Sequence, residues 1–181
     1  DLVDGTTYYG IVRAYDVAGN VSGDIVGDGV MLDISSPEAG IVVDGFEDDL
    51  EFTASTTTLS ATWSGFSDAG SGILFYEYAI GTTSGGTDVV DWTDNSTDTS
   101  ITITSLSLTG GSTYYVSVRA TDLVENVSDV VSSDGLTVDL IGPESGTVLD
   151  GTGADIDWTN SDTTLQASWL GFSDALSGIQ F

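Results

Sequence analysis

A repeat of 106 residues constrains this chain more than any other feature. The stretch Thr113 to Ser128, TYYVSVRATDLVENVS, matches Thr7 to Ser22, TYYGIVRAYDVAGNVS, at that spacing. About half of the positions that can be compared are identical at this offset. Similarity at a fixed period is typical of proteins that use one structural unit several times. We therefore expect one complete unit flanked by parts of two others.

Alternation of apolar side chains predicts the kind of unit. Tyr114, Val116 and Val118 alternate with more polar residues, which is the period-2 pattern of a strand with one buried face. No stretch has helical periodicity, and turn residues recur about every ten positions. Strands are expected at residues 8–15, 25–32, 40–43, 59–63, 73–80, 89–92, 101–108, 114–121 and 131–138. Seven short strands in one unit favour a β-sandwich, so the predicted class is all-β.

Two prolines mark the boundaries of the units. Pro37 and Pro143 are the only prolines, and they are 106 residues apart. We expect residues 1–35 to be the last strands of one unit, 36–141 to be a complete unit, and 142–181 to be the first strands of the next.

The net charge of the chain limits the classes of molecule that it can bind. The chain has 29 acidic and two basic residues, Arg13 and Arg119, and a net charge of −27. Such a field repels nucleic acid and anionic membrane surfaces. No apolar run is long enough to span a bilayer, so membrane insertion is not expected. Hydrophobic residues still make up 40% of the chain, which is enough for a packed core.

One pattern resembles the fibronectin type III family of β-sandwiches. It comprises Leu59, Ala61 and Trp63 on the second strand, then Tyr76 and Tyr78, and then Leu108 and the Tyr114 strand. Trp169 has the place of Trp63 in the next copy. The resemblance implies tandem seven-stranded immunoglobulin-like sandwiches. It also implies that Tyr114 and its equivalent Tyr8 form tyrosine corners, in which the hydroxyl bonds to backbone upstream. The phrases DxAGN and SGIxxYEYAIGT are similar to those of tandem arrays in very large secreted bacterial surface proteins.

The residue inventory argues against an enzyme. Histidine and cysteine are absent, which excludes a Ser–His pair and a histidine-bearing metal site. Paired carboxylates could hydrolyse glycosides, but with this many acids some pairs arise by chance. We expect no catalytic residue.

Calcium binding is the sharpest chemical hypothesis, because calcium prefers carboxylate and carbonyl oxygens. In a sandwich of this topology, the loops at one pole would gather Asp33, Asp68, Asp122 and Asn126 beside the incoming linker. A denser cluster is expected at the other pole, with Asp44, Glu47, Asp48 and Asp49. None of these acids has the spacing of an EF-hand. The alternative is that they cap local turns, as Asp and Asn commonly do.

Other conspicuous side chains have structural interpretations. Arg119 is predicted to face outward and to pair with Glu77 across neighbouring strands. Trp63 and Trp169 are expected in the core, whereas Trp92 and Trp158 are less constrained and could serve sugar binding or packing.

Two functions fit these expectations. The first is a structural repeat of a giant extracellular bacterial surface protein, which forms a stalk or self-assembled fibre for adhesion. The units would then contact neighbouring repeats, and identical chains could exchange strands in a homo-oligomeric filament. The second is a carbohydrate- or protein-binding module, including one accessory to a secreted hydrolase. Because the copies differ no more in loops than elsewhere, repetition alone favours the first.

Overall fold

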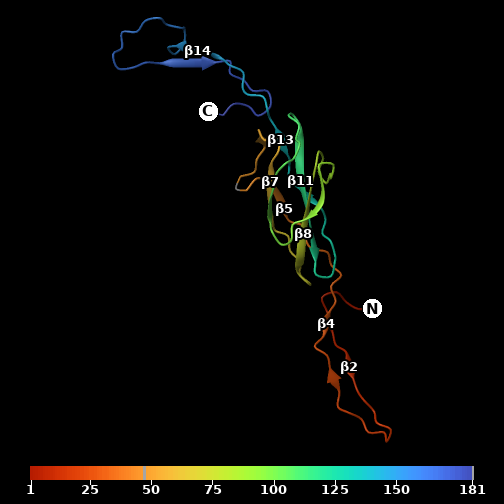
Figure 1. The fold of residues 1–181 in the computed structure, drawn as a ribbon. Helices are drawn as coiled ribbons and strands as arrows, with labels where there is room; N and C mark the ends of the chain where they lie inside the picture. The colour runs from red at the N-terminus through yellow and green to blue at the C-terminus, as the bar shows by residue number, and fades with distance from the viewer. Residues whose placement is uncertain (47, 181) are drawn as a thin grey trace.

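The computed structural model describes residues 1–46 and 48–180, and the chain is all-β across these residues. The molecule is elongated, with a sandwich in the centre and narrow β-hairpins at both ends (Figure 1). In the described part of the chain, no helix has the length and apolar character needed to cross a membrane.

The central sandwich consists of two packed sheets. The smaller sheet has the strand order β10-β7-β5, and the larger has the order β6-β13-β11-β8-β9, with β12 also paired to β11. The smaller sheet contains β5 (Ile41–Asp44), β7 (Leu59–Ser64) and β10 (Ser100–Ile103). The larger sheet contains β6 (Phe52–Thr53), β8 (Ile73–Gly81), β9 (Val90–Asp94), β11 (Thr113–Asp122), β12 (Val131–Ser132) and β13 (Leu136–Val138).

Alternate side chains from the two sheets form the core. Leu59, Ala61 and Trp63 point inward from β7, as their alternation predicts. They pack with buried residues of β8, β11 and β13, including Tyr76, whose ring meets that of Trp63 edge to face at 5.9 Å. Among the residues that the structure describes, the buried hydrophobic residues of the core lie between Val42 and Val138. This core therefore belongs to one sandwich.

Several strands differ from the expected ones. The expected strand 131–138 is divided into β12 and β13, because Ser133 turns inward and its hydroxyl accepts from the Val116 N–H. The expected strand 101–108 ends at Ile103, and Leu108 still reaches the core from a loop. The two-residue strand β6 was not expected, and it pairs in parallel with β13.

The N-terminal segment forms two narrow antiparallel pairs. β1 (Thr7–Tyr8) pairs with β4 (Val30–Met31), and β2 (Ile11–Val12) pairs with β3 (Ile25–Val26). Most apolar side chains of this segment are exposed; Val12, for example, is 70% exposed, whereas its repeat equivalent Val118 is fully buried.

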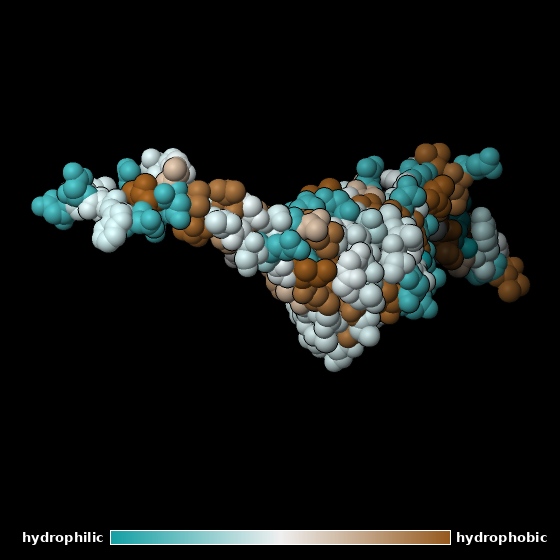
Figure 2. All heavy atoms as spheres, turned by 90° about the horizontal axis from the view of Figure 1, so that it is seen from above, coloured by the Kyte–Doolittle hydropathy of each residue, from teal (hydrophilic) through white to brown (hydrophobic). Residues whose placement is uncertain are grey.

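The C-terminal segment carries β14 (Thr147–Asp150), which pairs with β15 (Ala167–Leu170). The prediction that Trp169 lies in a core is wrong for this structure. Trp169 is 59% exposed, whereas Trp63 at the equivalent place is 4% exposed. The reason is that no second sheet faces β14 and β15 within the described residues. Figure 2 shows this segment as a narrow arm with brown, apolar side chains on its surface.

Candidate metal centre at the junction

The segment that enters the central sandwich is held by the carboxylate of Asp33. Its Oδ2 accepts a hydrogen bond from the Ser71 N–H at 2.6 Å, and its Oδ1 accepts from the Ser35 N–H at 3.3 Å. The carboxylate lies directly against Gly70, where a Cβ would come within 2.4 Å of it. Glycine at position 70 therefore allows this acid to approach the loop.

Asp68 organises the loop between β7 and β8. Its Oδ2 accepts hydrogen bonds from the backbone N–H groups of Gly70 at 3.1 Å and Gly72 at 2.7 Å. This is the local capping that makes aspartate common in turns.

Asp122 ends β11 and is fully buried. Its Oδ1 accepts from the backbone N–H groups of Val124 at 2.9 Å and Asn126 at 2.8 Å, and its Oδ2 accepts from the Asn126 side-chain amide at 2.8 Å. Burial by itself would raise the pKa of Asp122, but the hydrogen bonds from Asn126 and Val124 outweigh burial and lower the pKa. Asp122 is therefore ionised at neutral pH.

These three acids, which we call the junction acids, meet at one point. Asp33, Asp68 and Asp122 each offer a carboxylate oxygen, and these oxygens lie within 4.8 Å of one another. Asn126, expected in the same group, instead directs its amide nitrogen to Asp122. Both arginines form ion pairs with other acids: Arg13 pairs with Asp24, and Arg119 pairs with Glu77.

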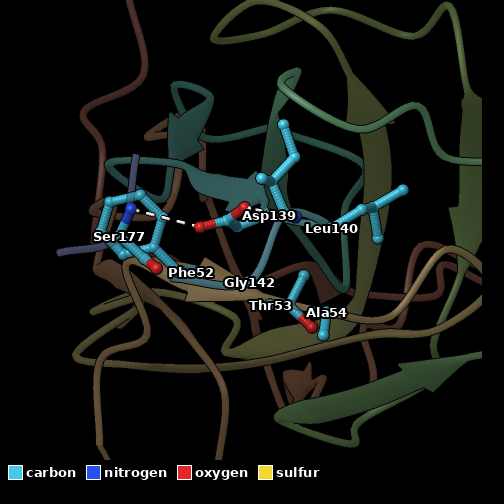
Figure 3. A pocket seen from close by; sticks show the side chains of 8 residues that line it. Phe52, Thr53, Ala54, Asp139, Leu140, Gly142 and Ser177 are labelled. Carbon is cyan, nitrogen blue, oxygen red and sulfur yellow. Dashed lines mark hydrogen bonds between the residues drawn. The ribbon is translucent and has the colours of Figure 1, made fainter. Parts of the chain in front are cut away.

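The second junction repeats part of this arrangement. Asp139, the equivalent of Asp33, accepts from the Ser177 N–H at 3.2 Å, and Asp174, the equivalent of Asp68, accepts from the Gly178 N–H at 3.0 Å. Leu176 replaces Gly70 here. Figure 3 shows the Asp139–Ser177 bond at the edge of a cavity of about 440 Å³, lined partly by Phe52 and Leu140.

At the opposite pole, the structure brings together Asp44, Asp49 and Asp134, which we call the pole cluster. Sequence reasoning missed Asp134, because its partner Asp44 is 90 residues away along the chain. Asp48 is exposed and lies outside this group, and Glu47 lies outside the described residues.

The chemistry of the pole cluster is that of a buried carboxyl group. Asp44 is 1% exposed, and burial raises its pKa to about 6 despite hydrogen bonds from Ser133 and the Gly135 N–H. The nearby charges of Asp134 and Asp49 raise it further.

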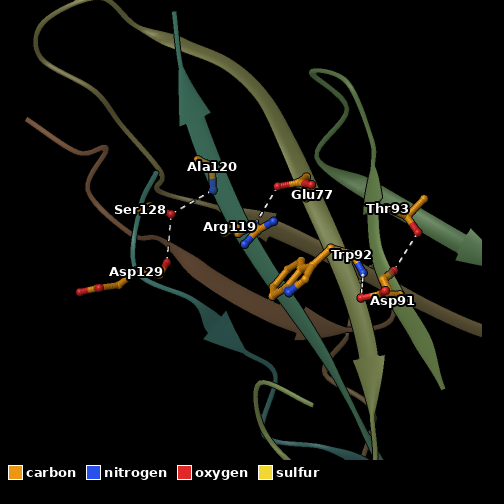
Figure 4. Close-up of polar contacts among 8 residues, drawn as sticks. All are labelled: Glu77, Asp91, Trp92, Thr93, Arg119, Ala120, Ser128 and Asp129. Carbon is orange, nitrogen blue, oxygen red and sulfur yellow. Dashed lines mark hydrogen bonds and ion pairs between the residues drawn. The ribbon is translucent and has the colours of Figure 1, made fainter. Parts of the chain in front are cut away.

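The Arg119 side chain is also placed by its strand. Arg119 on β11 lies opposite Glu77 on β8, and its Nε donates to Glu77 Oε2 at 2.7 Å, which is the expected pair. The guanidinium also stacks over Trp92 on β9 at 4.4 Å from the ring centre (Figure 4). Trp92 is therefore partly covered, whereas Trp158 is 90% exposed.

Both tyrosines expected to form corners make the corresponding bond. The Tyr114 hydroxyl accepts from the Thr109 N–H at 2.9 Å, and the Tyr8 hydroxyl accepts from the Val3 N–H at 2.6 Å.

The chain is similar to one stretch of a known enzyme. No family model matches it. It is 31% identical over 192 aligned residues to Exoglucanase B of Cellulomonas fimi. The alignment covers 94% of this chain but only 16% of that protein. The similarity therefore concerns a small part of the exoglucanase.

Proposed function

We propose that this chain is a non-catalytic segment of an extracellular carbohydrate-active protein, in which sandwiches repeated every 106 residues act as a spacer. The observation that carries the proposal is the similarity to Exoglucanase B, which covers 94% of this chain and 16% of that protein. A stretch so much shorter than the enzyme fits an accessory role better than the catalytic one. The adhesive stalk, favoured by repetition alone, gains no support from this comparison.

We also propose where the repeated units begin and end along the chain. We assign residues 36–141 to one fibronectin type III-like sandwich and the flanking segments, 1–35 and 142–181, to neighbouring units. The shared 106-residue spacing and the two tyrosine corners support this assignment. Units that contact mainly their neighbours form extended molecules, so their number would set the reach of the protein.

The acids of the central sandwich fit a structural role. Asp68 and Asp122 already accept backbone hydrogen bonds within their turns. A general acid in a glycosidase needs a raised pKa and access to substrate. Asp122 has a lowered pKa and is buried. Asp44 has a raised pKa of about 6, but it is only 1% exposed and so lacks access to a substrate. Both observations favour the non-catalytic proposal.

Carbohydrate binding is the second candidate, because Trp158 is 90% exposed and lines a cavity with Ile156 and Leu165. Co-sedimentation of the 181-residue chain with crystalline cellulose and insoluble xylan separates the two functions. A spacer stays in the supernatant and releases no reducing sugar. Saturable retention that Trp158→Ala abolishes would establish the binding module instead, and sugar release that requires the chain's own acids would establish an enzyme.

A further inference from the structure

The junction acids present a concentration of negative charge that no basic side chain offsets. One oxygen from each of Asp33, Asp68 and Asp122 lies within 4.8 Å of the others. The three come from separate segments, which are the incoming linker, the loop after β7 and the end of β11. Both arginines of the chain are engaged elsewhere. Like charges at this separation repel unless a cation lies between them.

The Ser71 hydroxyl is the second observation. Its oxygen is buried and makes no well-aligned hydrogen bond in the described residues. It lies close enough to Asp122 to lower the pKa of that carboxyl, whereas the backbone N–H of the same residue donates to Asp33. A buried hydroxyl without a well-aligned hydrogen bond is under-satisfied, and a cation beside it would provide the missing partner. Its place among the junction acids indicates a cation.

We propose that this junction binds one divalent cation of the calcium type through Asp33, Asp68, Asp122 and the Ser71 hydroxyl. All the ligands are oxygens, which suits calcium and disfavours zinc and copper. Calcium takes about six to eight oxygens in a flexible geometry, so water or backbone carbonyls complete the shell. Asp33 and Asp68 are partly exposed, which leaves the ion a path from solvent.

The ion would join two parts of the chain. Asp33 precedes Pro37, whereas the other three ligands belong to the central sandwich. Bound calcium therefore fixes the preceding segment to the sandwich and stiffens their connection. Calcium binding does not depend on the proposed spacer function, since either one can fail while the other holds.

Isothermal titration of the full 181-residue chain with calcium chloride tests the site, after all divalent ions are removed. We expect one saturable event per chain, in the range of about 10⁻⁴ to 10⁻³ M that is typical of extracellular modules. Asp33→Asn should weaken binding at least tenfold, and Ser71→Ala should weaken it severalfold without changing the charge. Asp129→Asn is the matched control, because Asp129 is exposed and outside both acidic groups.

Two further measurements distinguish a loss of calcium binding from a loss of folding. Far-ultraviolet circular dichroism in calcium-free buffer checks that each variant keeps its β-sheet signal. Calcium should raise the melting temperature of the wild type and of Asp129→Asn but not of Asp33→Asn. Absence of saturable binding would overturn the proposal. It would also be overturned if Asp33→Asn bound as tightly as the wild type, or if Asp134→Asn in the pole cluster removed the binding.

Discussion

The carboxyl group of Asp44 is buried, and burial disfavours its ionised form. Its ordinary pKa of 3.8 is raised to about 6, chiefly because it is buried. Between these two pH values the folded protein keeps a proton that the unfolded chain releases. Stability therefore falls as the pH rises from about 4 to about 6, and the loss is complete above that range.

Asp44→Asn should remove this loss. The amide keeps an acceptor for the Gly135 N–H, and its nitrogen can donate to the carboxylates of Asp49 or Asp134. We expect a gain of about 1 to 2 kcal/mol in the free energy of unfolding at neutral pH, allowing for solvent screening, and little gain near pH 4. Urea unfolding at both pH values measures this difference. Asp150→Asn, at the exposed equivalent position, is the control and should show no such pH dependence.

Glu125 has a backbone conformation that favours glycine. Its φ is 72°, and the equivalent residue in the first copy is Gly19, with a φ of 89°. The two residue types differ, but both turns have the same hydrogen bond: each residue donates its N–H to the backbone carbonyl of the aspartate that begins the turn, Asp122 and Asp16 respectively.

Glu125→Gly should therefore stabilise the sandwich by about 0.5 to 1 kcal/mol, because a side chain in this region costs more than the added freedom of glycine in the unfolded chain. Thermal unfolding at neutral pH would show the gain as a higher melting temperature. Glu125→Ala removes the same charge but keeps a Cβ, so it separates the two effects. Equal stabilisation by both variants would assign the gain to charge rather than to conformation.

Among the elements, β11 connects most of the sandwich. It pairs with β8, β12 and β13, and Tyr114 near its start bonds back to Thr109. The tyrosine thus fixes the loop that leads from the smaller sheet into β11.

Tyr114→Phe should cost about 1 kcal/mol, since it removes one hydrogen bond while keeping the buried ring. Chemical unfolding measures the loss. Tyr115→Phe alters a neighbouring ring on the other face of the strand, so it serves as the control. If the two variants were equally stable, the Tyr114 hydroxyl would have no role in holding the loop.

Strands such as β7 and β8 were predictable because their alternation is long and regular. The strand β6 was not predictable, since two residues carry no pattern and the pairing with β13 joins distant segments. The predicted topology placed the junction acids close together, because the loops at one pole of a sandwich are neighbours. No sequence pattern indicated that Asp134 lies beside Asp44. Local alternation indicated which face of its strand Trp169 occupies, but it could not indicate whether another sheet covers that face.

At the scale of the molecule, the N-terminal strand pairs continue the long direction of the sandwich, whereas the C-terminal segment with β14 turns off at an angle to it (Figure 1). The paired strands at either end point away from the central sandwich rather than packing onto its sides (Figure 1). Asp33 and Asp139 each connect a linker to a loop 38 residues further along the chain, at equivalent positions. A net charge of −27 further opposes collapse of the parts onto one another.

Small-angle X-ray scattering of the purified chain tests the spacer account most directly. A compact protein of 181 residues would have a radius of gyration of about 16 Å. The account predicts a clearly larger value, together with the Kratky peak of a folded body, because the sandwich stays compact while both ends extend from it. A radius close to about 16 Å, with the ends folded back onto the sandwich, would contradict it.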